Sequence, residues 1–164
     1  MLDKQDIRIE RLPPSQAAYI HSDGANPEEE SLTKIIVWAK TKKITSESGV
    51  HLFGRNTYPT DKPEPHGYEY YLTLNEAFNP EEGIKIEAFA GGLFAVLRFK
   101  NLFTIKDAWT SLMNWAKENG HQEVGVIKTE NGWVNSGFEE LINWEETIPP
   151  SEWIFDIWLQ IKQK

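Results

Sequence analysis

The sequence GYEYYLTL at residues 67–74 is matched by IFDIWLQI at residues 154–161, near the end of the chain. The alignment pairs Tyr68 with Phe155, Glu69 with Asp156, and Tyr71 with Trp158. Side chains alternate across a strand, so each stretch places one set of apolar residues on one face and a carboxylate followed by a large ring on the other. This recurrence predicts two copies of one structural unit.

Other matches occur in the same order along the chain. They pair residues 7–10 with 84–87, Ala18 and Ile20 with Ala95 and Leu97, and the Trp-Ala-Lys sequence 38–40 with 115–117. The second copy carries an insertion between its helix and its last strand, somewhere between Gly125 and Ser151. No linker or low-complexity tract divides the copies, so we expect a single domain over residues 1–164, with modules at about 6–76 and 83–162.

Each copy is predicted to form a strand, a helix and two further strands. The helices show apolar residues at the spacing of one buried stripe, namely Leu32, Ile35, Ile36 and Ala39, and Trp109, Leu112, Met113 and Ala116. Asn26 before Pro27 predicts one helix start, and Thr104 with Asp107 predicts a capping box at the other. We expect the helices to end near Lys43 and Gly120. The fold class is therefore α+β, with duplicated β-α-β-β modules, pseudo-twofold symmetry and an antiparallel sheet around a central ligand cleft.

Turn signals punctuate the rest of the chain. The strands that open the copies lead through Pro13-Pro14 and Gly91-Gly92 into a second extended piece, which predicts a bend or bulge at each pair. Asn131-Gly132 predicts a hairpin turn. Residues 58–65 hold several prolines and predict a loop.

Composition narrows the function classes. The chain has 164 residues, 40% of them hydrophobic, which is typical of a globular domain able to bury its own core. It has no cysteine, no long apolar run and no leader signal, so we expect a soluble cytoplasmic protein of bacterial type with no membrane association. The net charge of -8 argues against direct DNA binding and suits a cationic or neutral ligand.

The residues that carry chemistry are expected on the face of the sheet that the helices leave open. Glu69, Tyr71, Asp156 and Trp158 form a carboxylate and a ring in each copy, at symmetry-related positions. Rings beside a carboxylate suit a flat hydrophobic cation, through stacking and cation–π attraction. A carboxylate whose pKa is raised by apolar surroundings could also act as a general acid or base. The alternative interpretation is an ordinary solvated sheet face.

Four more residues are candidates for the same cleft. By alternation Tyr19, His21, Phe94 and Arg98 point away from the helices, with a solvated edge as the alternative. Arg98 could instead pair with Glu69 or Asp156, which would make those carboxylates structural.

The remaining tryptophans and histidines have plainer interpretations. Trp38 and Trp115 are expected in the core or at its rim, and Trp109 in the core. Trp133, Trp144 and Trp153 lie in or beside the insertion, where they form either a lid or a local hydrophobic cluster. The scattered histidines show no paired spacing, and no phosphate-binding loop is present, so no metal or cofactor is expected.

Several of these stretches resemble a known family. GGLFAVLRFK at residues 91–100, the preceding GIKIEAF, GYEYY at 67–71 and the closing FDIWLQIK are similar to GyrI-like small-molecule-binding domains, which also serve as effector-binding domains of MerR- and AraC-type multidrug transcription regulators. The likeness covers about residues 6–162. It implies an SHS2-like duplication around a cleft for hydrophobic, often cationic compounds. Many members place a Glu on the last strand, where this chain has the shorter Asp156, and Glu69 matches the acidic position of the first module.

Three functions follow as hypotheses. The first is a stand-alone effector- or drug-binding protein that takes planar, hydrophobic, cationic molecules between the two modules. The second is a hydrolase of cyclopropane-bearing electrophilic toxins, with Glu69 and Asp156 as candidate catalytic groups. The third is a protein-binding modulator such as a gyrase inhibitor. No helix-turn-helix segment precedes the first strand, so DNA binding by this chain alone is not expected.

Overall fold

The structure is a computed structural model that describes residues 7–23, 26–58, 67–81, 83–130, 132–144 and 147–163. Most of the loop predicted at 58–65 and Asn131 of the predicted turn lie outside these ranges. The elements in chain order are β1 Ile7–Leu12, β2 Ser15–Asp23, α1 Pro27–Thr41, β3 Leu52–Thr57, β4 Gly67–Leu74, β5 Lys85–Phe89, β6 Gly92–Lys100, a 3-10 turn Leu102–Thr104, α2 Ile105–Glu118, β7 Val126–Thr129, β8 Gly132–Asn135, β9 Phe138–Leu141, a 3-10 turn Pro150–Glu152 and β10 Ile154–Gln160.

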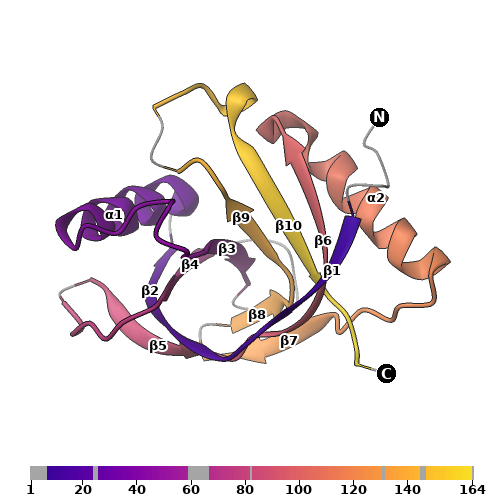
Figure 1. The fold of residues 1–164 in the computed structure, drawn as a ribbon, viewed down its shortest axis with the longest axis horizontal. Helices are drawn as coiled ribbons and strands as arrows, with labels where there is room; N and C mark the ends of the chain where they lie inside the picture. The colour runs from indigo at the N-terminus through magenta and orange to yellow at the C-terminus, as the bar shows by residue number, and fades with distance from the viewer. Residues whose placement is uncertain are drawn as a thin grey trace.

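One curved antiparallel sheet of eight strands organises the molecule, in the order β1-β6-β10-β9-β3-β4-β2-β5 (Figure 1). The order has twofold symmetry. Counted inward from one edge the strands are β1, β6, β10 and β9, and counted inward from the other edge they are the equivalent strands β5, β2, β4 and β3. The copies join at the centre, where Phe53 pairs with Glu140 and Gly54 with Glu139. The predicted α+β fold of duplicated modules is confirmed.

The first strand of each copy crosses to the other copy. β1 pairs with β6 of the second copy, and β5 pairs with β2 of the first. The predicted bends make this crossing possible, since the chain turns at Pro13-Pro14 and again at Gly91-Gly92. Gly91 has φ +73, and a Cβ there would lie 2.2 Å from the carbonyl oxygen of Leu12, so only glycine fits. The two copies are therefore interlocked within one sheet.

The two helices begin differently. α1 begins at Pro27 after Asn26, as predicted, although the Asn26 side chain makes no capping hydrogen bond. The capping box predicted for Thr104 and Asp107 is wrong. Thr104 donates its hydroxyl to the carbonyl oxygen of Asn101, and the Asn101 side chain accepts from the amide of Phe103. The reason is that the 3-10 turn precedes α2, so the first free amides belong to that turn and Asn101 caps them.

The helices cover one face of the sheet and bury the centre of each predicted stripe there. Ile35 and Ala39 of α1, with Leu112 and Ala116 of α2, are almost fully buried in the core between helices and sheet. Leu32, Ile36 and Trp109 are half-buried, and the prediction is wrong for Met113, which is exposed because it lines a cavity beside α2. The predicted insertion is the β7–β8 hairpin, which forms a separate small sheet and has no equivalent between α1 and β3. In the described ranges, neither helix is long and apolar enough to span a membrane.

Candidate ligand-binding site

The face of the sheet without helices is closed by a second hydrophobic cluster. Its buried rings are Phe53, Phe89, Phe94, Phe138 and Trp158, and Tyr71 packs against them. Trp158 is fully buried, and its ring centroid lies 5.3 Å from that of Phe53 and 5.6 Å from that of Phe94. Tyr71, Phe94 and Trp158 thus lie on the face predicted for them, but there they fill an interior together with Phe53, Phe89 and Phe138, which were not predicted.

The carboxylates of Glu69 and Asp156 on this face already accept hydrogen bonds from other side chains. Glu69 accepts from the Tyr19 hydroxyl at 2.6 Å and from Arg55 Nε at 2.6 Å. Asp156 is held by Arg98, with Nε at 2.9 Å, and by Arg8 Nη2 at 2.8 Å. Burial opposes ionisation of Asp156, but the hydrogen bonds from Arg98 and Arg8 hold its pKa below the ordinary value. The predicted alternative of an Arg98 ion pair is thus confirmed for Asp156.

Of the other predicted residues, Tyr19 and His21 lie on the same face. His21 Nε2 is 2.8 Å from the hydroxyl of Thr57. Tyr19 and His21 line a small polar cavity together with Lys85. The eight predicted ligand residues share one face, and none of them lines the two cavities described below. Their role as ligand contacts stays a prediction.

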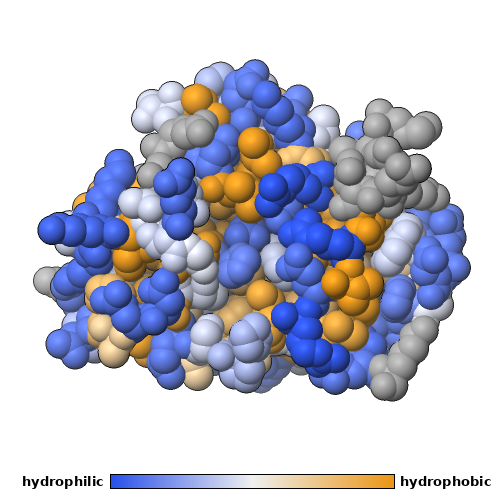
Figure 2. Space-filling view, viewed as in Figure 1, coloured by the Kyte–Doolittle hydropathy of each residue, from blue (hydrophilic) through white to orange (hydrophobic). Residues whose placement is uncertain are grey.

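A groove of about 740 Å³ lies on the other side of the sheet, between α1 and α2. Its floor is formed by β4, β9 and β10, and its rim by the first turns of both helices and the 3-10 turn before β10. The lining residues include Glu28, Leu32, Tyr68, Tyr70, Ile105, Glu139, Trp153 and Phe155. Figure 2 shows the molecule from the side on which β1 and β6 lie in front, where apolar side chains lie among hydrophilic ones. The volume lies within the range of small-molecule sites.

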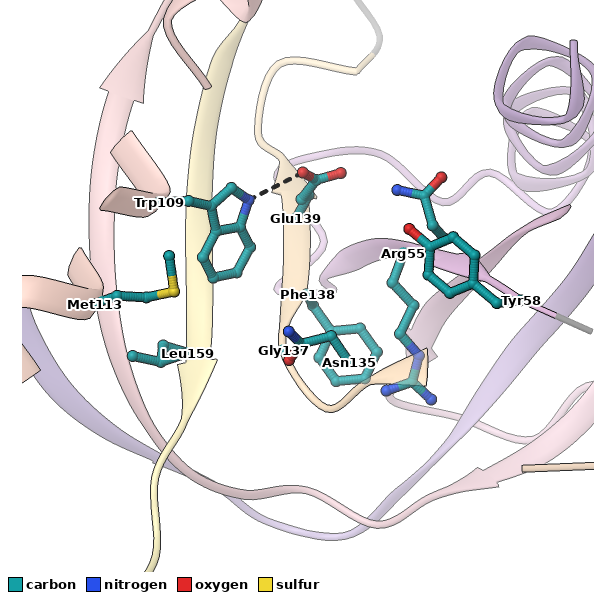
Figure 3. A pocket seen from close by; sticks show the side chains of 10 residues that line it. Arg55, Tyr58, Trp109, Met113, Asn135, Gly137, Phe138, Glu139 and Leu159 are labelled. Atoms are coloured by element: carbon teal, nitrogen blue, oxygen red, sulfur yellow. Dashed lines mark hydrogen bonds between the residues drawn. The ribbon is translucent and has the colours of Figure 1, made fainter. Parts of the chain in front are cut away.

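Glu139 is the polar centre of this groove. One carboxylate oxygen accepts from the Tyr68 hydroxyl at 3.0 Å, and the other accepts from the indole Nε1 of Trp109 at 3.1 Å (Figure 3). Within the described ranges, no Lys, Arg or His forms an ion pair with it. Burial raises the pKa of Glu139, against the opposing effect of its two hydrogen bonds. Unlike Glu69 and Asp156, this carboxylate is held by neutral donors alone among the residues that the structure describes.

Gly54 makes room for the rings that reach Glu139. It is the direct partner of Glu139 across the centre of the sheet. A Cβ on Gly54 would lie 2.7 Å from atoms of both Tyr68 and Tyr70. Burial raises the pKa of both tyrosines, so they stay neutral and Tyr68 donates its proton to Glu139. Gly54 of the first copy thus pairs with Glu139 of the second. Because the two equivalent positions hold different residues, the twofold symmetry does not extend to the side chains at the site.

Sequence reasoning missed Glu139 and misjudged Trp109. Glu139 stands beside Glu140 in the short strand FEEL, where alternation alone does not say which carboxylate faces the helices. Glu140 faces the other way and binds Trp158 Nε1 and His51 Nδ1. Trp109 was predicted to be core, yet its indole nitrogen points at Glu139.

A smaller cavity of about 210 Å³ adjoins the groove on the α2 side. Trp109, Met113 and Leu159 form one wall, and Arg55 and Tyr58 lie on the opposite side (Figure 3). Asn135 also lines this cavity. Gly137 lies against the indole of Trp109, since a Cβ there would be 3.2 Å from the ring. Asn56 and Glu139 line both the groove and this side cavity.

A duplicated half-barrel of this kind, with an apolar groove and a carboxylate on the groove floor on its helix side, is typical of a small-molecule-binding domain of the α+β class. The comparison with protein families agrees, because the GyrI-like small molecule binding domain matches residues 5–162. The chain belongs to this family.

Solved structures share the fold at low sequence identity. The chain is similar to the EcmrR C-terminal domain with a TM-score of 0.63 and 17% identity, over 96% of this chain and 98% of that one. It is similar to EcmrR in a DNA complex with a TM-score of 0.66 and 17% identity, over 96% of this chain, but it spans only 57% of the EcmrR chain.

Two further structures show the same fold. A hydrolase from Listeria innocua has a TM-score of 0.63 and 9% identity, over 97% of this chain and 93% of that one. SAV2435 bound to tetraphenylphosphonium has a TM-score of 0.51 and 6% identity, over 95% of this chain and 93% of that one. A comparison with curated proteins gave no match.

Proposed function

We propose that this chain binds a hydrophobic, aromatic cation in the groove between α1 and α2, with Glu139 as the counter-charge. The observation that carries the proposal is the state of Glu139. It is a partly buried carboxylate on the floor of an apolar groove, and it receives hydrogen bonds from Tyr68 and Trp109 but no ion pair from the described residues. Burying a carboxylate without a cation is costly, and a cationic ligand would offset that cost.

The surroundings of Glu139 favour a positive charge. Glu28 and Glu29 stand at the rim, and no basic residue is among the described residues that line the groove. The net charge of -8 adds a favourable long-range field for cations. Tyr68, Tyr70, Trp153 and Phe155 supply ring faces and edges for stacking and cation–π attraction. The structural similarity to SAV2435 bound to tetraphenylphosphonium suggests a suitable probe.

Calorimetric titration with tetraphenylphosphonium tests the proposal. We expect saturable binding that Glu139→Gln weakens about tenfold or more, since a charge-assisted contact contributes on the order of 1.5–3 kcal/mol. Asp156→Asn is the control, because it neutralises a carboxylate on the opposite face whose partners, Arg8 and Arg98, line neither cavity. Mass spectrometry should recover the compound intact.

Two results would contradict this assignment. If Glu69→Gln or Asp156→Asn weakens the binding of tetraphenylphosphonium and Glu139→Gln does not, the site lies at the residues predicted from the sequence. Absence of binding by tetraphenylphosphonium and by a panel of planar aromatic cations would remove the cation-binding function itself.

A hydrolase of electrophilic, cyclopropane-bearing compounds is the second candidate, and one observation favours it. The raised pKa of Glu139 beside the Tyr68 hydroxyl suits a general base that takes a proton from an attacking water. The Listeria innocua neighbour is a hydrolase, at 9% identity. Mass spectrometry tests this activity. The unmodified chain should convert many equivalents of the compound to a product heavier by one water molecule, and Glu139→Gln should not form this product. A role on a protein partner, a role in transcription regulation and a cytoplasmic location stay predictions.

A further inference from the structure

We infer that the side cavity between α2 and the β7–β8 hairpin is a second subsite, which accepts the neutral, flat arm of an elongated ligand whose cationic part lies in the groove. This inference rests on the proposed function and specifies the shape of its ligand. It assigns a role to the hairpin, which the duplication of the fold does not explain.

Glu139 connects the two spaces. Its two oxygens are held from opposite sides, by Tyr68 from the groove and by Trp109 from the wall of the side cavity. A carboxylate has about four lone-pair sites, so acceptor capacity remains after these two hydrogen bonds. A cation beside Glu139 would therefore lie at the junction, with space on both sides of it.

The size of the side cavity fits an arm better than a whole ligand. Its volume of about 210 Å³ lies below the range of about 300–1,000 Å³ usual for separate ligand sites. A cavity of about 150 Å³ accepts benzene, so this one has room for about one substituted ring.

The walls define the chemistry of the arm. Trp109, Met113 and Leu159 offer an apolar surface on one side, and Tyr58 lies across from them (Figure 3). Asn56 and Asn135 add polar groups to the lining. Arg55 gives no net charge to the cavity, because Glu69 holds its Nε at 2.6 Å. A neutral ring that carries hydrogen-bonding substituents on one edge matches these walls.

In the part of the chain that the structure describes, the subsite exists on one side of the pseudo-twofold axis only. In the first copy the chain runs from α1 to β3 without a hairpin, whereas in the second copy β8 leads through Asn135 and Gly137 into β9 and closes the cavity. The asymmetry predicts that an elongated ligand binds in one orientation.

The test compares two cations in calorimetric titrations. Tetraphenylphosphonium is compact, and thioflavin T is an elongated monocation of two linked ring systems. Met113→Trp fills the side cavity from α2, and Asn135→Phe fills it from the hairpin, where the residue is exposed. The matched control is Val37→Trp, on the exposed side of α1 and outside both cavities.

We expect each filling variant to raise the ratio of the thioflavin T dissociation constant to that of tetraphenylphosphonium at least tenfold, and Val37→Trp to leave it unchanged. An unchanged ratio in a folded filling variant would overturn the subsite, as would binding of tetraphenylphosphonium without any binding of thioflavin T. Failure of both cations to bind the unmodified chain would instead overturn the proposed function.

Discussion

Glu139 and Gly54 occupy equivalent places in the two copies, and the difference between them creates the site. The glycine leaves room for the Tyr68 and Tyr70 rings, and the carboxylate receives the Tyr68 hydroxyl. A carboxylate at both positions would place two negative charges side by side on directly paired residues. One carboxylate and one glycine avoid this repulsion and leave a single anionic centre.

The raised pKa of Glu139 predicts that cation binding depends on pH. A bound cation stabilises the carboxylate form, so affinity is fully present above the raised pKa and is lost as the pH falls through it. The loss should begin at a higher pH than for an ordinary glutamate and approach tenfold per pH unit. Tetraphenylphosphonium titrations across pH measure it, and Glu139→Gln should give a weak, flat profile.

Asp156 provides the contrast for this pH dependence. Its pKa is lowered by Arg98 and Arg8, so its charge persists to lower pH than that of an ordinary aspartate. An affinity that falls only in the more acidic range where Asp156 titrates would argue for Asp156 and against Glu139.

Gly54→Ala should reduce both stability and affinity. The added methyl group would overlap two buried rings, and overpacking of this kind costs about 1–3 kcal/mol. Urea unfolding measures the stability, and calorimetry measures the affinity for tetraphenylphosphonium. Gly49→Ala is the control, because a Cβ there meets nothing within 4 Å and only the backbone cost at φ +77 remains. If Gly49→Ala lowers the affinity for tetraphenylphosphonium as well, the effect of Gly54→Ala would not show that Gly54 acts on the site.

At the scale of the elements, the start of α2 positions Trp109 over Glu139. Asn101 has φ +87, and its side chain accepts from the Phe103 amide at the start of the 3-10 turn that leads into the helix. The buried residues Ala108 and Leu112 then orient the helix so that Trp109 and Met113 face the side cavity. The cap that matters for this helix is therefore Asn101, upstream of the residues predicted to form a capping box.

Asn101→Ala should lower the free energy of unfolding by about 1–3 kcal/mol, since it removes the cap and leaves the Cβ at positive φ without the polar side-chain contact that accompanies it. Asn101→Gly keeps the conformation and should cost only the cap. Asp107→Ala should cost less than about 1 kcal/mol, because it removes only a favourable charge in the first turn. Urea unfolding measures the free energy of unfolding of all three variants. A larger loss of stability for Asp107→Ala than for Asn101→Ala would support the predicted capping box instead.

The whole molecule is interlocked by its opening strands. β1 is part of the first copy in sequence but pairs with β6 of the second, and β5 is part of the second copy but pairs with β2 of the first. Each half of the sheet therefore contains one strand from the other copy. The central pairing of β3 with β9 is short, and the exchanged strands add a second connection between the halves. This arrangement favours a single domain, which stays a prediction.

We therefore expect one cooperative unfolding transition. Urea unfolding followed by tryptophan fluorescence and by far-ultraviolet circular dichroism should give coincident curves. Gly54→Ala, although it lies in the first copy, should shift both curves together. Two separate transitions, or a shift of only one signal, would show that the copies unfold as independent units.

The sequence alone determined the duplication, the helices, the bends and the residues that share each strand face. These features depend on local periods of 3.6 and 2 residues and on turn chemistry, which are visible without the fold. Which face of the sheet holds the open groove was decided by tertiary structure. The curvature of the sheet brings Phe53, Phe138 and Trp158 together and closes one face, while the separation of α1 and α2 leaves the other open around Glu139. The exchange of the opening strands was likewise invisible in the sequence, because pairing between strands far apart in the chain depends on long-range packing.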